Sequence, residues 1–154
     1  MSPLATNILA RTVLLVDDEV LVRVAVGQQL RDCGYRVIEA AGADEALVVL
    51  RRPEIRLDVV LSDVEMPGTM DGFALAAWVR TNRPDLKVIM AGTITRAVDA
   101  AIMLCEEGPL PGSYEPQNLL SRIKQLMARR AARRVIKSWR GLTTRVWRSA
   151  GRRS

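Results

Sequence analysis

The sequence predicts an α/β domain in which a parallel sheet is covered by helices on both faces, and three observations support this class. Short apolar runs alternate five times with segments of helical periodicity, as repeated βα units require. Residues 59–62 are free of charge and half β-branched, which is typical of a strand buried on both faces. Acidic residues directly follow two of the apolar runs, where open α/β sheets place their ligand crevice.

Composition restricts the possible classes of function. A chain of 154 residues, 49% of them hydrophobic, can build one core with an appendage. It has no apolar run of about 18 residues, and residues 1–11 lack the pattern of a signal peptide, so we expect a cytoplasmic protein. Histidine is absent, which excludes histidine-based acid–base chemistry, histidine-ligated metals and a phosphohistidine carried by this chain.

The first half of the chain reads as strand, acidic loop, helix, strand, helix, strand. Gly34 closes the first helix as a C-terminal glycine does, Asp44 suits the first turn of the second helix, and Pro53 stops that helix. The third strand delivers Asp63 at its carboxyl end. We expect strands over residues 11–16, 36–40 and 58–62, and helices over residues 20–33 and 44–52.

The second half continues the alternation. Asp71 and Gly72 indicate a turn before the next helix, and Pro84 ends that helix. Residues 108–112 contain two glycines and two prolines, so they leave room for only a weak fifth strand, after which Pro116 opens the last helix. We expect helices over residues 73–83, 95–105 and from 116, and strands over residues 87–91 and about residues 108–112.

The acidic residues at the strand ends predict a metal site. With the first and third strands adjacent, Asp17, Asp18 and Asp63 converge in one crevice, and their mutual repulsion calls for a hard cation such as Mg²⁺. In an alternative interpretation, Asp17 and Asp18 only cap the helix that follows, which is worth about 0.3–1 kcal/mol.

The two cysteines give no sign of redox or metal chemistry. Cys33 and Cys105 stand far apart in the sequence and form neither a CxxC pair nor a metal knuckle. We expect both to be buried free thiols.

Three motifs together resemble the receiver domain of bacterial two-component response regulators. They lie at residues 14–19, 60–67 and 70–72, and the resemblance extends over residues 11–128. It implies a flavodoxin-like, doubly wound, five-stranded parallel sheet with strand order 2-1-3-4-5.

The resemblance also implies a role for each acidic residue. Asp63 would accept a phosphoryl group from the phosphohistidine of a histidine kinase or of a histidine phosphotransfer protein. Asp18 and Asp63 would bind Mg²⁺ directly, Asp17 through a water molecule, and Glu65 through its backbone carbonyl. The chain would then be no enzyme beyond assisting its own phosphoryl transfer.

The chain departs from the receiver pattern where receivers usually sense the phosphoryl group. Gly92 occupies the position of the usual Thr or Ser, or Ala91 does if the register differs by one residue, and Thr93 is the nearest hydroxyl. Gly112 aligns with the usual Lys, and Pro109 aligns with the usual aromatic switch residue. An alternative function is therefore a degenerate pseudo-receiver that acts as a phosphorylation-independent interaction module.

Charge divides the chain into an acidic domain and a basic tail. Residues 122–154 carry 12 of the 23 Lys and Arg and none of the 17 acidic residues. We expect an N-terminal extension over residues 1–10, a receiver domain over residues 11–128 and a basic amphipathic extension over residues 129–154.

Within the extension, apolar side chains recur at spacings of 4, 3 and 4, as on one stripe of a helix; they are Val135, Trp139, Leu142 and Val146. Three interpretations remain open. The extension is a solvated continuation of the last helix, which could pack Trp139 or Trp147 on its own domain or on a second copy in a homodimer. It binds an anionic membrane or the groove of a partner protein. It binds nucleic acid through charge alone.

Overall fold

The computed structural model describes residues 11–150, with side chains up to residue 141. The N-terminal extension expected over residues 1–10 and the arginines at 152 and 153 lie outside this range. Strands and helices alternate as far as α5, and α6 follows α5 without an intervening strand. The elements are β1 (Thr12–Val16), α2 (Val20–Asp32), β2 (Arg36–Ala40), α3 (Ala43–Leu50), β3 (Val59–Ser62), α4 (Gly72–Asn82), β4 (Lys87–Met90), α5 (Ile94–Glu106) and α6 (Pro116–Ala150).

The strands form one parallel sheet in the order β2-β1-β3-β4. All residues of β1 and β3 are buried, as expected for the two central strands of a doubly wound sheet. In the register of these two strands, Val16 lies opposite Ser62. The residues that follow, Asp17 and Asp63, therefore leave the sheet side by side. The predicted α/β class is confirmed.

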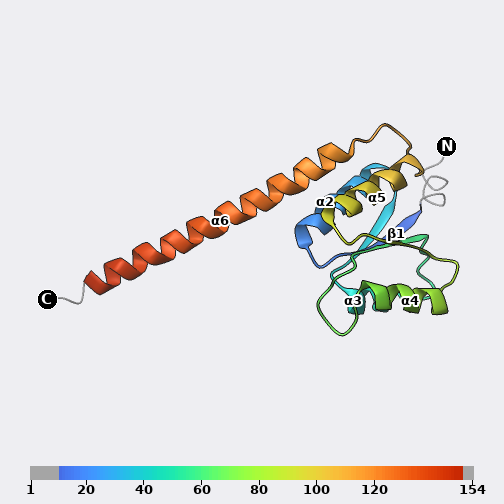
Figure 1. The fold of residues 1–154 in the computed structure, drawn as a ribbon, viewed down its shortest axis with the longest axis horizontal. Helices are drawn as coiled ribbons and strands as arrows, with labels where there is room; N and C mark the ends of the chain where they lie inside the picture. Colours follow the sequence, from blue (N-terminus) through green and yellow to red (C-terminus); the bar gives the residue numbers. More distant parts are fainter. Residues whose placement is uncertain (1–10, 151–154) are drawn as a thin grey trace.

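Helices cover both faces of the sheet, and β1 contributes alternately to each layer (Figure 1). Val13 and Leu15 belong to the core under α2, α5 and the first turns of α6. Leu14 and Val16 belong to the core under α3 and α4. The period-2 alternation of a strand thus connects two hydrophobic layers through one buried element.

The fifth strand expected about residues 108–112 does not form within residues 11–150. Pro109 and Pro111 have no N–H group to donate to a neighbouring strand. The segment bonds elsewhere, because the backbone N–H of Leu110 donates to the carbonyl oxygen of Cys33 at 3.1 Å. This bond holds the segment beside the end of α2, and β4 remains the edge of the four-stranded sheet.

Because the expected fifth strand does not form, the last helix runs in the direction opposite to that expected for a helix that follows such a strand. α5 begins beside the carboxyl ends of the strands at Thr93 and ends at the opposite edge of the sheet. No strand carries the chain back, so α6 starts at that opposite edge and runs towards the carboxyl edge. Leu119 and Ile123 are buried on the way, and Arg130 reaches Glu19, the N-cap of α2.

α6 then continues away from the domain as a single long rod (Figure 1). The expected boundary between residues 128 and 129 lies inside this helix, which spans 35 residues without a break. Despite its length, α6 is too polar to cross a membrane, and no other helix between residues 11 and 150 is long and apolar enough to do so.

The expectation of free thiols is wrong, because Cys33 and Cys105 form a disulfide across 72 residues of sequence. Cys33 follows α2, and Cys105 lies in the last turn of α5. These two helices end side by side, which places the two Cα atoms 5.4 Å apart. Both side chains are fully buried. Spacing in the sequence carries no signal for this contact, because it depends on how two helices pack.

We expect reduction of this disulfide to destabilise the domain. Opening a cross-link between residues 72 apart relaxes the unfolded chain and costs on the order of 2–4 kcal/mol. Urea unfolding should therefore show a lower midpoint when a thiol reductant is added. The double variant Cys33→Ala/Cys105→Ala is the control, since its unfolding midpoint should not change when the reductant is added. Equal midpoints of the wild type with and without reductant would contradict a formed disulfide.

Candidate functional site

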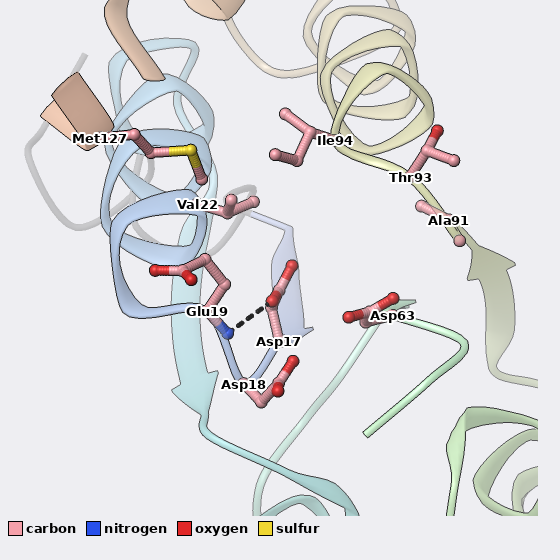
Figure 2. Close-up of a pocket in the computed structure, with 10 residues that line it drawn as sticks. Asp17, Asp18, Glu19, Val22, Asp63, Ala91, Thr93, Ile94 and Met127 are labelled. Atoms are coloured by element: carbon pink, nitrogen blue, oxygen red, sulfur yellow. Dashed lines mark hydrogen bonds between the residues drawn. The ribbon is translucent and has the colours of Figure 1, made fainter. Parts of the chain in front are cut away.

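Three carboxylates meet at the carboxyl edge of the sheet. Asp17 and Asp18 follow β1, and Asp63 follows β3. One carboxylate oxygen from each lies within 4.8 Å of the others. Figure 2 shows the three side chains turned towards one another from the two adjacent strand ends. The predicted convergence of these residues is therefore present in the structure.

Backbone hydrogen bonds position two of the carboxylates. The N–H of Glu19 donates to Oδ1 of Asp17 at 2.8 Å, and the N–H of Val64 donates to Oδ1 of Asp63 at 2.7 Å. At the strand ends, the N–H of Asp63 donates to the carbonyl oxygen of Val16 at 2.8 Å, so the last rung of the sheet fixes its backbone. The Glu65 N–H also bonds the Asp63 carboxylate, so backbone donors directly after β3 hold this side chain in place.

Helix capping does not explain Asp17 and Asp18. The N-cap of α2 is Glu19, whose side chain accepts from the N–H of Leu21 at 3.3 Å. The acidic pair precedes this cap, and Asp17 is turned into the crevice with only 8% of its surface exposed. The alternative interpretation of the pair as caps is therefore disfavoured.

The electrostatics of the cluster favour a bound cation. Burial, and then repulsion from Asp63 and Asp18, raises the pKa of Asp17 to about 6, although the hydrogen bond from the Glu19 N–H lowers it. Burial is also the main cause that raises the pKa of Asp63, with Asp18 adding to it. Three converging carboxylates of this kind fit a hard divalent cation such as Mg²⁺, which prefers oxygen ligands.

The carboxylates form one wall of a hollow of about 370 Å³. The opposite wall comes from the start of α5 and from the last helix. Met127 of α6 lies above Val22, as Figure 2 shows. The sequence did not predict a contribution from Met127, because the resemblance implied a last helix that follows a fifth strand. The lining residues are Asp17, Asp18, Glu19, Val22, Asp63, Ala91, Gly92, Thr93, Ile94 and Met127.

A second contribution of α6 is an ion pair at the rim of the hollow. Arg130 donates from both terminal nitrogens to the carboxylate of Glu19, at 2.8 and 3.2 Å. The two side chains are 35% and 34% exposed. The hydrogen bond from Arg130 is the largest of the causes that lower the pKa of Glu19. The last helix is thus bonded to the residue that directly follows the acidic pair.

The structure brings two of the four altered switch positions to the site. Gly92 and Thr93 line the hollow, but the Thr93 hydroxyl oxygen accepts from the N–H of Arg96 at 3.1 Å and caps α5. A Cβ atom on Gly92 would lie 3.3 Å from Cγ2 of Val64, so a larger residue there must displace that side chain.

The other two switch positions lie outside the lining of the hollow. Pro109 packs beside Gly34 near the end of α2, at the opposite edge of the sheet, and Gly112 lies beside Tyr114. Glu65 follows β3, and its backbone N–H bonds Asp63. A role for the Glu65 carbonyl in metal binding stays a prediction.

Gly72 belongs to the third motif, residues 70–72, and packs against the backbone that carries Asp63. A Cβ atom on Gly72 would collide with the carbonyl oxygen of Asp63. Its N–H donates to the carbonyl oxygen of Val64 at 2.9 Å. The carboxylate of Asp71 accepts from the N–H of Ala74 at 2.8 Å and starts α4 there. The start of α4 is therefore packed directly against the backbone that carries Asp63, which restricts the Asp63 loop.

A carboxylate cluster at the carboxyl edge of a doubly wound parallel sheet, between its first and third strands, defines the receiver class of signalling domains. The family model described as "Response regulator receiver domain" matches residues 13–110. The chain belongs to this family, whose members act in two-component signalling. Binding of Mg²⁺ and phosphorylation are typical of these domains.

Solved structures agree with this assignment. The chemotaxis response regulator CheY4 of Vibrio cholerae is 30% identical with a TM-score of 0.51, over 75% of this chain and 98% of that one. The response regulator TrrA of Thermotoga maritima, in complex with Mg²⁺ and BeF, is 27% identical with a TM-score of 0.50, over the same shares of 75% and 98%.

Two curated relatives are much longer proteins. The sensor kinase CckA of Brucella abortus is 35% identical over 118 residues, which are 75% of this chain and 12% of that protein. The response regulator protein FleR of Pseudomonas aeruginosa is 40% identical over 95 residues, which are 60% of this chain and 20% of that protein. The chain thus spans a small part of the length of either relative.

We expect Asp17 to make the stability of the metal-free domain depend on pH. The ordinary pKa of an aspartate is 3.8, whereas the pKa of Asp17 in the folded protein is about 6, so between these two pH values the folded state keeps a proton that the unfolded chain releases. The free energy of unfolding should therefore fall across this window as the pH rises, and less so in Asp17→Asn. Added Mg²⁺ should restore stability above the window.

Chemical unfolding at a series of pH values measures this difference. Asp99→Asn, on the exposed face of α5, is the control and should follow the wild type. Parallel curves for the wild type and Asp17→Asn would show that burial does not raise the pKa of Asp17.

We also expect removal of Arg130 to raise the pKa of Glu19. Because the folded pKa is lowered from 4.5, the pair stabilises the fold above that pH and loses its effect as the pH falls through the folded value. A carboxyl titration by NMR should place the pKa of Glu19 higher in Arg130→Gln than in the wild type. Arg129→Gln removes the same charge one residue earlier and should have a smaller effect. Equal shifts in both variants would indicate a general charge effect without the ion pair.

Proposed function

We propose that this receiver domain accepts a phosphoryl group on Asp63 from a phosphohistidine of a partner protein. The observation that supports this function best is the meeting of three carboxylate oxygens within 4.8 Å at the carboxyl edge of the sheet. Phosphoryl transfer needs mainly positioning and neutralisation of charge. Asp63 offers the nucleophile, and its neighbours offer ligands for a cation that neutralises the phosphoryl oxygens.

Each residue has a separate task in this proposal. An oxygen of Asp63 attacks phosphorus, and the bond from phosphorus to the histidine nitrogen breaks. The Val64 N–H holds the other oxygen of Asp63, which orients the attack. Asp18 and Asp63 would bind Mg²⁺ directly, Asp17 would hold it through water, and Glu65 would add its backbone carbonyl. Bound Mg²⁺ supplies positive charge for the phosphoryl oxygens.

The partners follow from the composition of the chain and from its relatives. Since the chain has no histidine, the phosphohistidine comes from a histidine kinase or a histidine phosphotransfer protein. The similarity to a sensor kinase and to a response regulator supports partners of this class. The location we propose is the cytoplasm, where the disulfide is unusual because thiols there are normally kept reduced. The chain is no enzyme beyond assisting its own phosphoryl transfer.

A second candidate function is a pseudo-receiver that signals by binding without phosphate. Two features favour it. Gly92 has no hydroxyl to follow a phosphoryl group, and the hydroxyl of the neighbouring Thr93 caps α5. The fifth strand, which carries the usual lysine, is absent between residues 11 and 150. The usual way in which a receiver transmits its phosphorylation signal is therefore altered, although the three carboxylates of the acceptor site are present.

Labelling with a small phosphodonor separates the two functions. The full chain, incubated with acetyl phosphate and Mg²⁺, should gain one phosphoryl group by mass spectrometry, and hydroxylamine should remove it as it does from an acyl phosphate. Asp63→Asn should abolish the gain, and chelation of Mg²⁺ should suppress it. The matched control is Asp99→Asn, which removes an exposed carboxylate of α5 and should label normally.

No labelling of the folded wild type, by acetyl phosphate or by a phosphorylated histidine phosphotransfer protein, would favour the pseudo-receiver. Labelling that persists in Asp63→Asn would place the acceptor elsewhere.

A further inference from the structure

The part of α6 beyond Arg130 has no place in the phosphoacceptor function. It is here called the projecting segment and comprises residues 131–150. It leaves the domain at the carboxyl edge of the sheet (Figure 1). Among its described side chains are three large apolar ones with high exposure: Val135 at 55%, Ile136 at 53% and Trp139 at 67%.

The exposed apolar side chains do not continue the face of α6 that packs on the domain. Ile123 is fully buried against that domain. At 3.6 residues per turn, Val135 and Trp139 are rotated about 120° and about 160° from Ile123 around the helix axis. The stripe therefore points away from the domain, and packing of the extension on its own domain is disfavoured.

Charge makes the projecting segment unstable as an isolated helix. From Pro116 to Ala150 the sequence has ten basic residues and no acidic one. Within the segment, Arg133 and Lys137 are like charges spaced by four residues, and such a pair destabilises a helix. Arg134 and Lys137 are like charges spaced by three residues and are neighbours on the helix surface as well. Most of the stability of a helix in a protein comes from packing of its apolar face, and the apolar stripe of this segment is turned away from the domain. A surface of opposite charge would remove the repulsion and stabilise the helical form.

We propose that the projecting segment binds an anionic lipid surface, with the stripe of Val135 and Trp139 inserted at the interface. Such a surface matches both features, because it neutralises the basic face of an amphipathic helix and buries the apolar one. A second copy of the helix would bring like charges together. A nucleic acid would neutralise the charge but leave the apolar stripe in water.

Attachment at this place has a consequence for the receiver domain. The Glu19–Arg130 ion pair joins the start of α2 to the last residue before the projecting segment. The edge of the domain nearest to the bound helix is therefore the edge that carries the carboxylates. The domain would be held with this edge close to the lipid surface.

Co-sedimentation of the full chain with vesicles tests the proposal. The chain should bind vesicles of mixed phosphatidylcholine and phosphatidylglycerol and not vesicles of phosphatidylcholine alone, and added salt should weaken binding. Val135→Ser/Trp139→Ser should weaken binding about tenfold or more, because both side chains lose the gain from leaving water. The matched control is Val48→Ser/Phe73→Ser, which alters side chains of similar exposure, 58% and 64%, on the domain and should bind as the wild type does.

Three outcomes would overturn the proposal. The first is the absence of binding to anionic vesicles. The second is binding that Val135→Ser/Trp139→Ser leaves unchanged, because charge alone would then be sufficient. The third is tighter binding of the same chain to duplex DNA than to the vesicles at equal salt. Circular dichroism of each variant confirms that the fold is retained. Phosphoryl labelling of Asp63 in solution is a separate readout and does not depend on the lipid.

Discussion

The in-register pairing of β1 with β3 is the constraint on which the site depends. Val16 and Ser62 are opposite one another, so the two strands end together and carry Asp17 and Asp63 into the same crevice. A shift of one residue in either strand would turn its side chains to the other face of the sheet. The hydrophobic layers on both faces oppose such a shift. Packing of the core therefore holds together carboxylates that repel one another.

The missing fifth strand changes the direction of the last helix and, with it, the surroundings of the site. Because α6 follows α5 directly, it runs back to the carboxyl edge and brings Met127 and Arg130 to the rim of the hollow. The basic projecting segment starts at the same place. The last helix therefore contacts Glu19, the residue next to the acidic pair. This contact lies far from the altered positions Pro109 and Gly112.

Opposite charges therefore occupy defined places along one chain. The pocket concentrates carboxylates, and burial raises the pKa of Asp17 and of Asp63. Arg130 supplies the first positive charge beside the pocket and lowers the pKa of Glu19. After Arg130, every charged residue of α6 is basic. The ion pair marks the boundary between an acidic domain and a basic extension, within one continuous helix.

The sequence by itself determined the α/β class, the order of the first eight elements of the domain, the place of Asp63 and the division of charge. These features depend on local periodicity and on which residues follow a buried strand. Only the tertiary structure decided three others: the disulfide of Cys33 with Cys105, the direction of α6, and the contact of Arg130 with Glu19. Each joins residues far apart in the sequence. Their proximity results from the packing of α2, α5 and α6, for which no local pattern carries a signal.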